Sequence, residues 1–314
     1  VVAMHPGAKQ VVARAGETLL EAGLRAGLAL PYECRNGGCG VCVCSVLNGR
    51  VDHGSFQPAV LTPSMREAGK ALMCCATPLG DVEIDVDVAT LEPAGAVAIR
   101  ACEARVESME RLGATVMRLR LSLPDGARIA FAAGQYLNVL LADGQRRAFS
   151  FANAPHDNAM IELHVRLIAG GRFTTHVFTR MQVGDTLRVE APLGRFTLHA
   201  GDRPILFVAG ATGFAPIKSI IEDAFHRGIA RPMRLYWGVR DPDDLYMREL
   251  LERWRREHPQ FSYVTVLSEP AAAPAWDGRT GLVHEAILED YPDLHGHELY
   301  VCGSVQMVDA AVPA

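Results

Sequence analysis

The sequence predicts a multidomain chain that joins α+β and α/β parts, and three observations support this class. Its 314 residues exceed the usual length of one domain, so two or three domains are expected. The middle of the chain holds short strands of alternating polarity separated by glycine turns, which is typical of a small antiparallel barrel. The last third alternates apolar strands with helices, which is typical of a parallel sheet covered on both faces.

The composition argues against several classes of function. The net charge of −5 gives no electrostatic reason to expect a nucleic-acid partner. No membrane span is expected, because the most apolar stretch, residues 205–217, is short and contains glycine and proline. The first residues show no export signal. The chain does not begin with methionine, so we expect its natural start to lie upstream.

Residues 1–92 are expected to form the first domain. Thr18 and Glu21 form a capping box at the start of a helix with an apolar face. Residues 44–51 are predicted to form a strand with an Asn-Gly turn at 48–49. Residues 81–88 alternate acidic and aliphatic side chains, which predicts a half-buried strand, and such an acidic row is more often a solvated face than a docking surface. Residues 91–96 contain a proline and a glycine and are predicted to be a linker.

A cysteine motif at residues 34–42 is the most specific signal in this domain. Cys34, Cys39 and Cys42 follow the spacing Cys-x4-Cys-x2-Cys, and Cys74 and Cys75 follow after a long gap. Four thiolates in this pattern suit a 2Fe–2S cluster, whereas a zinc site usually shows two Cys-x2-Cys pairs. Purely structural thiols are disfavoured because four of the eight cysteines keep this spacing. Spacing alone leaves open whether Cys74 or Cys75 is the fourth ligand.

Residues 98–200 are expected to form a second, mostly β domain. Strands are predicted at residues 105–109, 116–123, 135–141, 146–153 and 161–167, and glycine turns join the first and the second pair. A helix is predicted over residues 172–181. Gly170 and Gly171 precede this helix, so its free backbone amides can face an anion such as a diphosphate.

Residues 201–314 are expected to form an α/β domain. A continuous apolar strand at residues 204–209 leads into a glycine-containing turn at 210–216 and a helix that ends near residue 226. Further strands are predicted near residues 235–238, 263–267 and 299–302, and helices near 244–255 and 283–288. Ligands of parallel sheets bind beyond the carboxyl ends of the strands. The glycine turn and the pair Cys302 and Gly303 stand at such ends and are predicted to face a ligand.

The cysteine segment resembles plant-type ferredoxins, whose last ligand stands in a Leu-x-Cys-x-Ala-x-Pro setting. Residues 72–78, with the sequence LMCCATP, match that setting when Cys74 is the ligand. The resemblance therefore implies a β-grasp fold for the first domain. It implies four cluster ligands, namely Cys34, Cys39, Cys42 and Cys74.

Nearly the whole chain resembles ferredoxin–NAD(P)H reductase-type flavoproteins with an N-terminal 2Fe–2S ferredoxin domain, as in the reductase components of bacterial oxygenases. Within this family it looks most like CDP-6-deoxy-glucoseen reductases, through residues 31–43, 51–54 and 236–238.

The flavin motifs of this family have counterparts in the second domain. Residues 147–150, with the sequence RAFS, resemble the flavin motif Arg-x-Tyr-Ser. The resemblance implies that Arg147 pairs with the FAD diphosphate, that Phe149 stacks on the flavin in place of tyrosine, and that Ser150 acts catalytically beside flavin N5. The Gly-x-x-Ser/Thr turn that holds the diphosphate is matched by Gly171, Arg172, Phe173 and Thr174.

Two segments of the last domain resemble the family's nicotinamide site. Residues 210–216, GATGFAP, are similar to the nucleotide turn, with Ala211 in place of a frequent glycine. Residues 302–307, CGSVQM, resemble a Cys-Gly-x-Pro-x-Met segment, which implies a catalytic role for Cys302. The implied cofactor contacts are Gly210, Thr212, Gly213, Cys302 and Gly303. The family normally continues further, so we expect the natural C-terminus to lie beyond Ala314.

The resemblance implies that NADH delivers a hydride to FAD and that single electrons pass through the 2Fe–2S cluster to a protein acceptor, such as an oxygenase or a sugar-deoxygenation dehydratase. NADH is expected rather than NADPH because residues 241–244 are rich in acids that repel a 2′-phosphate, although Arg240 offsets this repulsion. Two alternatives stay open, a stand-alone NADH flavin or quinone reductase and a ferredoxin-like carrier without reductase activity. Cysteines used for a cluster fit a reducing compartment, so a cytoplasmic location is expected.

Overall fold

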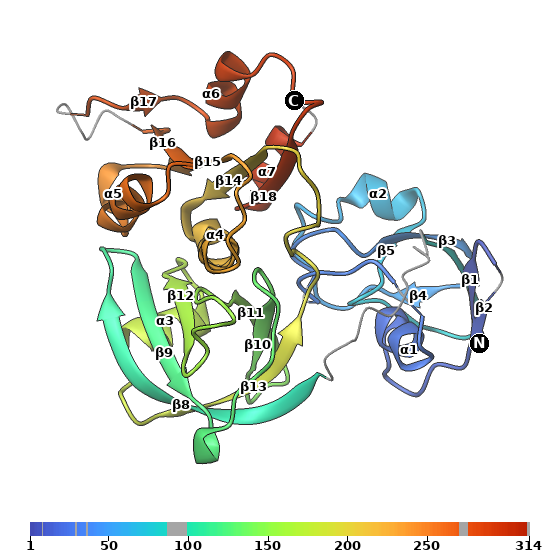
Figure 1. The fold of residues 1–314 in the computed structure, drawn as a ribbon. Helices are drawn as coiled ribbons and strands as arrows, with labels where there is room; N and C mark the ends of the chain where they lie inside the picture. Colours follow the sequence, from blue (N-terminus) through green and yellow to red (C-terminus); the bar gives the residue numbers. More distant parts are fainter. Residues whose placement is uncertain (8, 29, 36, 87–98, 270–275, 313–314) are drawn as a thin grey trace. The chain divides into compact units, whose positions relative to one another are not determined.

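The computed structural model describes residues 1–7, 9–28, 30–35, 37–86, 99–269 and 276–312. The chain divides into two compact units, Val1–Ala98 and Ile99–Ala314, and Figure 1 labels their helices and strands. The predicted linker at residues 91–96 lies outside the described residues.

The first unit is a small mixed sheet with one principal helix. Its strands are β1 (Val2–His5), β2 (Lys9–Val11), β3 (Val43–Asn48), β5 (Lys70–Leu72) and β7 (Val82–Asp85), in the order β2-β1-β7-β3-β5. The helix α1 (Leu19–Arg25) begins at Thr18 with the predicted capping box, and its residues Leu19 and Leu20 are fully buried. A short helix, α2 (Pro63–Glu67), precedes β5. This arrangement is the expected β-grasp.

The predicted strand at residues 44–51 is wrong in its continuity. The strand β3 ends at Asn48, and the chain enters β4 (Val51–Asp52), which pairs with β6 (Thr77–Pro78) rather than with β3. Gly49 has a φ of 86°, and a Cβ there would lie 2.3 Å from the Asp81 carbonyl oxygen. The close approach of another backbone segment therefore redirects the chain at this turn. In β7 the expected alternation is present, with Val82 and Ile84 buried and the acidic residues exposed.

The second unit begins with an antiparallel barrel of six strands. They are β8 (Arg100–Arg111), β9 (Val116–Ser122), β10 (Tyr136–Leu140), β11 (Arg146–Ser150), β12 (Ile161–Arg166) and β13 (Thr186–Leu193), in the order β11-β10-β13-β8-β9-β12. The two edges meet where the Ala152 amide donates to the Glu162 carbonyl at 2.8 Å. A 3-10 turn, η1 (Pro124–Gly126), follows β9, and the predicted helix forms as α3 (Arg172–Thr179). The strand β13 is an addition to the predicted set.

A parallel sheet follows the barrel, as predicted. Its strands are β14 (Ile205–Gly210), β15 (Met233–Val239), β16 (Phe261–Leu267), β17 (Arg279–Thr280) and β18 (Glu298–Cys302), in the order β17-β16-β15-β14-β18. The turns η2 (Ala211–Gly213) and η3 (Pro242–Asp244) follow β14 and β15. Because the Asp241 side chain caps η3, the helix predicted from residue 244 begins only at residue 248.

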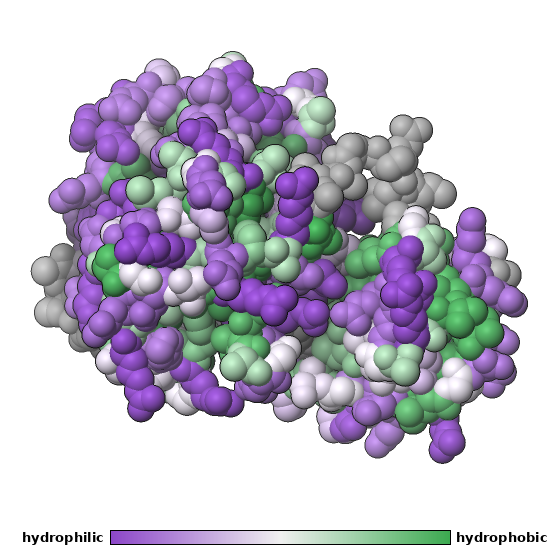
Figure 2. Space-filling model, turned by 90° about the horizontal axis from the view of Figure 1, so that it is seen from below, coloured by the Kyte–Doolittle hydropathy of each residue, from purple (hydrophilic) through white to green (hydrophobic). Residues whose placement is uncertain are grey.

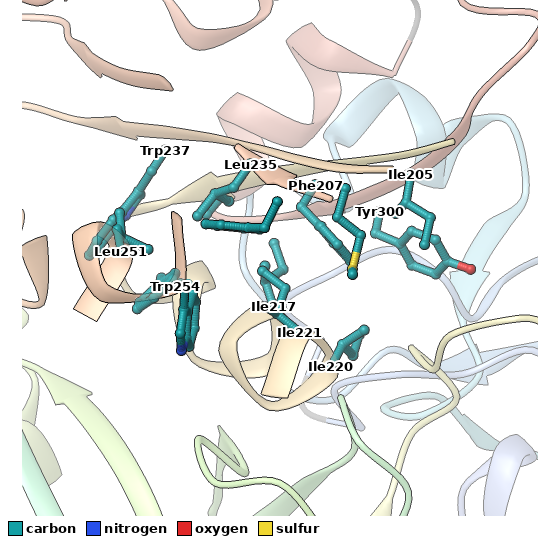
Figure 3. Close-up of a cluster of buried hydrophobic side chains, with 14 of the residues drawn as sticks. Ile205, Phe207, Ile217, Ile220, Ile221, Leu235, Trp237, Leu251, Trp254 and Tyr300 are labelled. Carbon is teal, nitrogen blue, oxygen red and sulfur yellow. The ribbon is translucent and has the colours of Figure 1, made fainter. Parts of the chain in front are cut away.

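Helices cover both faces of this sheet. The helices α4 (Phe214–His226) and α5 (Arg248–Glu257) pack on one face, where Ile217, Ile220 and Trp254 contact the strands' apolar side chains (Figure 3). On the other face lie α6 (Val283–Asp290) and α7 (Val305–Ala311). Figure 1 shows α4 on the side of the sheet that faces the barrel.

The surface is mostly polar. Figure 2 shows a face on which hydrophilic residues predominate and hydrophobic residues form smaller patches. Within the described ranges, no helix has the length and apolar character that a bilayer span requires.

Candidate functional site

The cysteine loop lies between α1 and β3, and the remaining cysteine pair follows β5. Cys42 is buried, whereas Cys34, Cys39 and Cys74 are half-buried. Val41, within the loop, is 46% exposed. The loop thus reaches the surface of the first unit, and Asn36 within it lies outside the described residues.

Sulfur contacts link Cys34 with Cys39, Cys42 with Cys74, and Cys74 with Cys75. The pKa of Cys39 is raised, first by its hydrogen bond with Cys34 and then by burial. The pKa of Cys42 is raised in the same way by Cys74 and by burial. Among the residues that the structure describes, no three metal-binding side chains converge on one ion. Two pairs are the arrangement that a 2Fe–2S cluster needs, because each of its two irons takes two thiolates.

The adjacent Cys74 and Cys75 both lie against the cysteine loop. Cys74 is hydrogen-bonded to Cys42 and to Cys75, and these contacts lower the pKa of its thiol. Cys75 lies 3.5 Å from Cys74, sulfur to sulfur, and packs against the loop, since a Cβ on Gly37 would come within 2.9 Å of its sulfur. Both sulfurs therefore lie near the loop, and Cys74 stays the predicted fourth ligand.

The backbone of the loop fits a cluster. Gly37 and Gly40 have φ values of 72° and 77°, and Arg35 has a φ of 52°. Such left-handed conformations suit glycine and cost a residue with a side chain about 1–2 kcal/mol. The Gly38 amide donates to the Cys34 sulfur at 3.3 Å, the kind of contact that tunes a metal centre.

The two predicted flavin motifs come together in the barrel. Phe149 on β11 and Phe173 on α3 have ring centroids 5.4 Å apart. Arg147 donates to Gln145 Oε1 at 2.6 Å and to the Arg146 carbonyl at 2.9 Å, which leaves part of its five-donor guanidinium for a phosphate. Ser150 ends β11, and strand alternation places its side chain on the face opposite to Arg147 and Phe149. A cofactor that contacts all three must therefore lie along the edge of β11.

The turn before α3 is held by a side chain that we expected to contact the cofactor. Thr174 is buried, and its hydroxyl accepts from the Ile168 amide and donates to the Gly171 carbonyl, both at 3.2 Å. Its hydroxyl therefore shapes the turn. The amides at the start of α3 remain as donors for a diphosphate, and Arg172, with 82% of its side chain exposed, bonds to Asp143 at 3.1 Å beside them.

The predicted nicotinamide segments meet at the carboxyl ends of β14 and β18. A Cβ on Gly213 would lie 2.0 Å from the Cys302 carbonyl oxygen. A Cβ on Gly210 would lie 3.3 Å from the Gly303 Cα and 2.5 Å from the Met307 sulfur. The glycine turn and the Cys302 segment thus pack backbone against backbone, which only glycine permits. This contact explains why both segments need glycine at these positions.

The nucleotide turn contains one residue, Ala211, with an unfavourable backbone conformation, and a hydrogen bond from a neighbouring strand stabilises it. Ala211 has a φ of 48°, in the left-handed region that favours glycine. The indole Nε1–H of Trp237 on β15 donates to the Ala211 carbonyl at 2.9 Å. This bond holds the turn in place from the neighbouring strand.

Sequence reasoning missed a polar network beside this turn. Glu162 and His164 on β12 are almost fully buried, although the alternation of their strand predicted one solvated face. They contact Lys218 on α4 and Tyr246 after η3. Lys218, which stands among the apolar residues of the first half of α4, was the available signal, since lysine is almost never buried without a partner.

Comparison with protein families divides the chain into three matched segments. Residues 4–79 match the 2Fe-2S iron-sulfur cluster binding domain, residues 103–198 the oxidoreductase FAD-binding domain, and residues 207–312 the oxidoreductase NAD-binding domain. The chain therefore uses a 2Fe–2S cluster, FAD and a nicotinamide nucleotide, as expected. It is an oxidoreductase, which excludes the carrier without reductase activity.

Individual relatives cover nearly the whole chain. Reductase component 1 of terephthalate 1,2-dioxygenase from Comamonas is 38% identical over 94% of this chain and 86% of that protein. The CDP-6-deoxy-L-threo-D-glycero-4-hexulose-3-dehydrase reductase of Yersinia pestis is 36% identical over 99% of this chain and 92% of its own. The crystal structure of the Amycolatopsis cytochrome P450 reductase GcoB superposes with a TM-score of 0.81 at 34% identity, covering 100% of this chain and 94% of that one. The chain belongs to the family of ferredoxin–NAD(P)H reductase-type flavoproteins with an N-terminal 2Fe–2S domain, which pass electrons from NAD(P)H through FAD and the cluster.

Proposed function

We propose that this protein draws on NADH and delivers single electrons to a protein acceptor, either an oxygenase component or a sugar-deoxygenation dehydratase. The observation that carries the proposal is the surface position of the cysteine loop, with Val41 46% exposed between two ligands. A cluster at this position can be approached by a large partner. The Comamonas and Yersinia relatives serve a dioxygenase and a dehydrase by name, and these are the two acceptor classes we consider.

The proposal gives each site residue a role. Cys34 and Cys39 would hold one iron, and Cys42 and Cys74 the other. When bound, FAD takes a hydride from the nicotinamide and the cluster carries one electron at a time. The diphosphate of FAD would be held by Arg147, Arg172 and the amides after Gly171, and the flavin ring would be oriented by Phe149, Phe173 and Ser150. The nicotinamide would be held by Gly210, Thr212, Gly213, Cys302 and Gly303.

The proposal also includes the domain limits and the cellular location of the protein. We propose domain limits of 1–92, 98–200 and 201–314. A reducing, cytoplasmic location fits cysteines that serve as cluster ligands.

The preference for NADH has support at the end of β15. Arg240, which directly precedes the acids of residues 241–244, lies 3.8 Å from the Glu269 carboxylate, Nε to Oε1. The paired guanidinium is therefore partly neutralised as a binding group for a 2′-phosphate. Both side chains are about two-thirds exposed, so this pair is weak and can be altered without harm to the fold. Glu269→Gln should raise kcat/KM for NADPH while leaving that for NADH almost unchanged, and an unchanged NADPH value would refute this role.

Electron delivery is tested with a protein that accepts one electron. Wild-type protein and a Cys42→Ala variant are compared with NADH as donor and with either ferricyanide or cytochrome c as acceptor. We expect the variant to keep flavin and ferricyanide reduction and to lose cytochrome c reduction, because its cluster is missing. Equal reduction of cytochrome c by both proteins would instead favour the stand-alone flavin or quinone reductase.

A further inference from the structure

Buried polar side chains join the barrel to the parallel-sheet part of the second unit. Glu162 and His164 on β12 are 6% and 4% exposed, and Lys218 on α4 is 6% exposed. The Lys218 ammonium donates to the Ala152 carbonyl and to Glu222, both at 2.9 Å, and lies 3.5 Å from Glu162. The opposite charges in this site are therefore paired, as burial requires.

The hydrogen bonds of His164 have a definite direction. Its Nε2 lies 3.1 Å from Glu162 Oε1, and its Nδ1 lies 3.0 Å from the Tyr246 hydroxyl. An ionised carboxylate only accepts, so Nε2 carries the proton and donates to Glu162. Burial lowers the pKa of His164 and keeps the ring neutral, which leaves Nδ1 to accept from Tyr246. The three side chains form a chain of hydrogen bonds, called the relay below. Glu162 orients the His164 ring, and His164 in turn orients the Tyr246 hydroxyl.

The relay ends at the nucleotide turn. The Tyr246 ring packs edge-on against Trp237 at 5.2 Å and against Phe214 at 6.1 Å, measured between ring centroids. Trp237 stacks on Phe214 at 4.2 Å and donates its indole N–H to the Ala211 carbonyl. Phe214 directly follows the turn η2. Contacts therefore run without a break from β12 of the barrel to the backbone of the turn.

The contact between the two parts is not filled by apolar packing at this place. A cavity of about 1380 Å³ opens beside the relay, and Glu162, Lys218 and Tyr246 line it together with Arg120 and His156. Apolar contacts between Ala133 and α4 and a hydrogen bond from Ser219 to the Asn153 carbonyl also join the two parts. At the edge of the cavity, the buried hydrogen bonds of Glu162, His164 and Tyr246 add a fixed contact that leads toward the nucleotide turn.

We propose that Glu162, His164 and Tyr246 are positioning residues for hydride transfer, because they set where the nucleotide turn stands relative to the flavin site on the barrel. This inference rests on the proposed roles of that turn and of β11. A shift of 1 Å between reacting groups can cost about 100-fold in rate, so small changes in this alignment are measurable.

The test uses full-length protein loaded with FAD and the cluster. Tyr246→Phe keeps the ring and removes only the hydroxyl. We expect the limiting rate of flavin reduction by NADH in rapid mixing to fall about 5- to 10-fold, with flavin content and NADH affinity nearly unchanged. Without NADH, hydrogen–deuterium exchange should become faster at residues 210–216 and stay the same in β9 and β10. An unchanged limiting rate together with unchanged exchange would overturn the inference.

Two further variants distinguish a specific effect of the relay from a general weakening of the contact between the barrel and the parallel-sheet part. Thr115→Val removes the bond from Thr115 to Asp244, 3.0 Å long, which joins the same two parts but does not reach the turn. It should leave the rate unchanged, and an equal loss would overturn the inference. His164→Leu should slow reduction, and adding Tyr246→Phe to it should slow it no further, whereas additive losses would show that the two residues act separately. Wild-type protein that failed to oxidise NADH would refute the proposed function itself.

Discussion

Gly213 offers a direct test of the proposed nicotinamide site. A single methyl group at this position would push the glycine turn at residues 210–216 away from the segment that begins at Cys302. In Gly213→Ala the new Cβ would stand 2.0 Å from the Cys302 carbonyl oxygen and 2.5 Å from its carbon. Real Cβ contacts are not shorter than 3.0 Å, so the carbonyl must retreat by about 1 Å. Both contacts are backbone atoms at the end of β18, and no side-chain rotation can relieve them.

The size of the effect follows from this displacement. Overpacking of a buried contact costs about 1–3 kcal/mol of stability, which a folded domain survives. A misplacement of about 1 Å at a reacting centre costs about 100-fold in rate. We therefore expect Gly213→Ala to remain folded, to keep FAD and the cluster, and to reduce its flavin with NADH about 100-fold more slowly.

The assay follows flavin absorbance after rapid mixing with NADH, with dithionite as a reductant that needs no binding site. Gly296→Ala is the matched control, since a Cβ there meets nothing within 4 Å. Gly210→Ala should be milder, because its closest contact is the flexible end of Met307 at 2.5 Å. A folded Gly213→Ala protein that reacts with NADH as fast as the Gly296→Ala control would refute the assignment of this turn.

Three more predictions, two of them with a matched variant, address the other sites. Cys74→Ala should abolish the visible and EPR signals of the cluster while Cys75→Ala keeps them, and the reverse result would make Cys75 the ligand. Lys218→Met should lower the free energy of unfolding by about 3–5 kcal/mol in a denaturant titration, because the carboxylates of Glu162 and Glu222 lose their buried cationic partner. Arg227→Met, in the more exposed pair at the end of the same helix, should cost at most about 1 kcal/mol, and equal losses would contradict this account. Ser150→Ala should slow flavin reduction about 5- to 150-fold at normal FAD content, and unchanged kinetics would exclude a role in hydride transfer.

Elements that depend on neighbouring residues could be predicted from the sequence. Burial that depends on contacts with distant segments could not. The capping box at Thr18 and the turns of the barrel need only neighbouring residues, and they form as predicted. In β12 the polar residues alternate as on a solvated strand, yet five of its six residues are buried because α4 and Tyr246 cover that face. The strand β13 was overlooked although Leu187, Val189 and Ala191 alternate with polar residues, which is the local pattern of a half-buried strand. Long-range packing decided the burial of β12, whereas β13 was predictable from its own residues.

The same distinction separates two kinds of functional residue in this chain. The proposed cofactor contacts come from short segments in which cysteine, glycine or arginine stands at fixed spacing, so a sequence motif can predict them. The alignment of the barrel with the nucleotide turn comes from single residues on β12, α4 and the segment after η3, which no local pattern connects. Loss of a side chain that holds a cofactor, as for Cys74, should lower the content of that cofactor, whereas Tyr246→Phe should leave every cofactor bound and alter only the rate. Cofactor content and limiting rate, measured on the same preparation, therefore distinguish loss of a cofactor from a change in the geometry of hydride transfer.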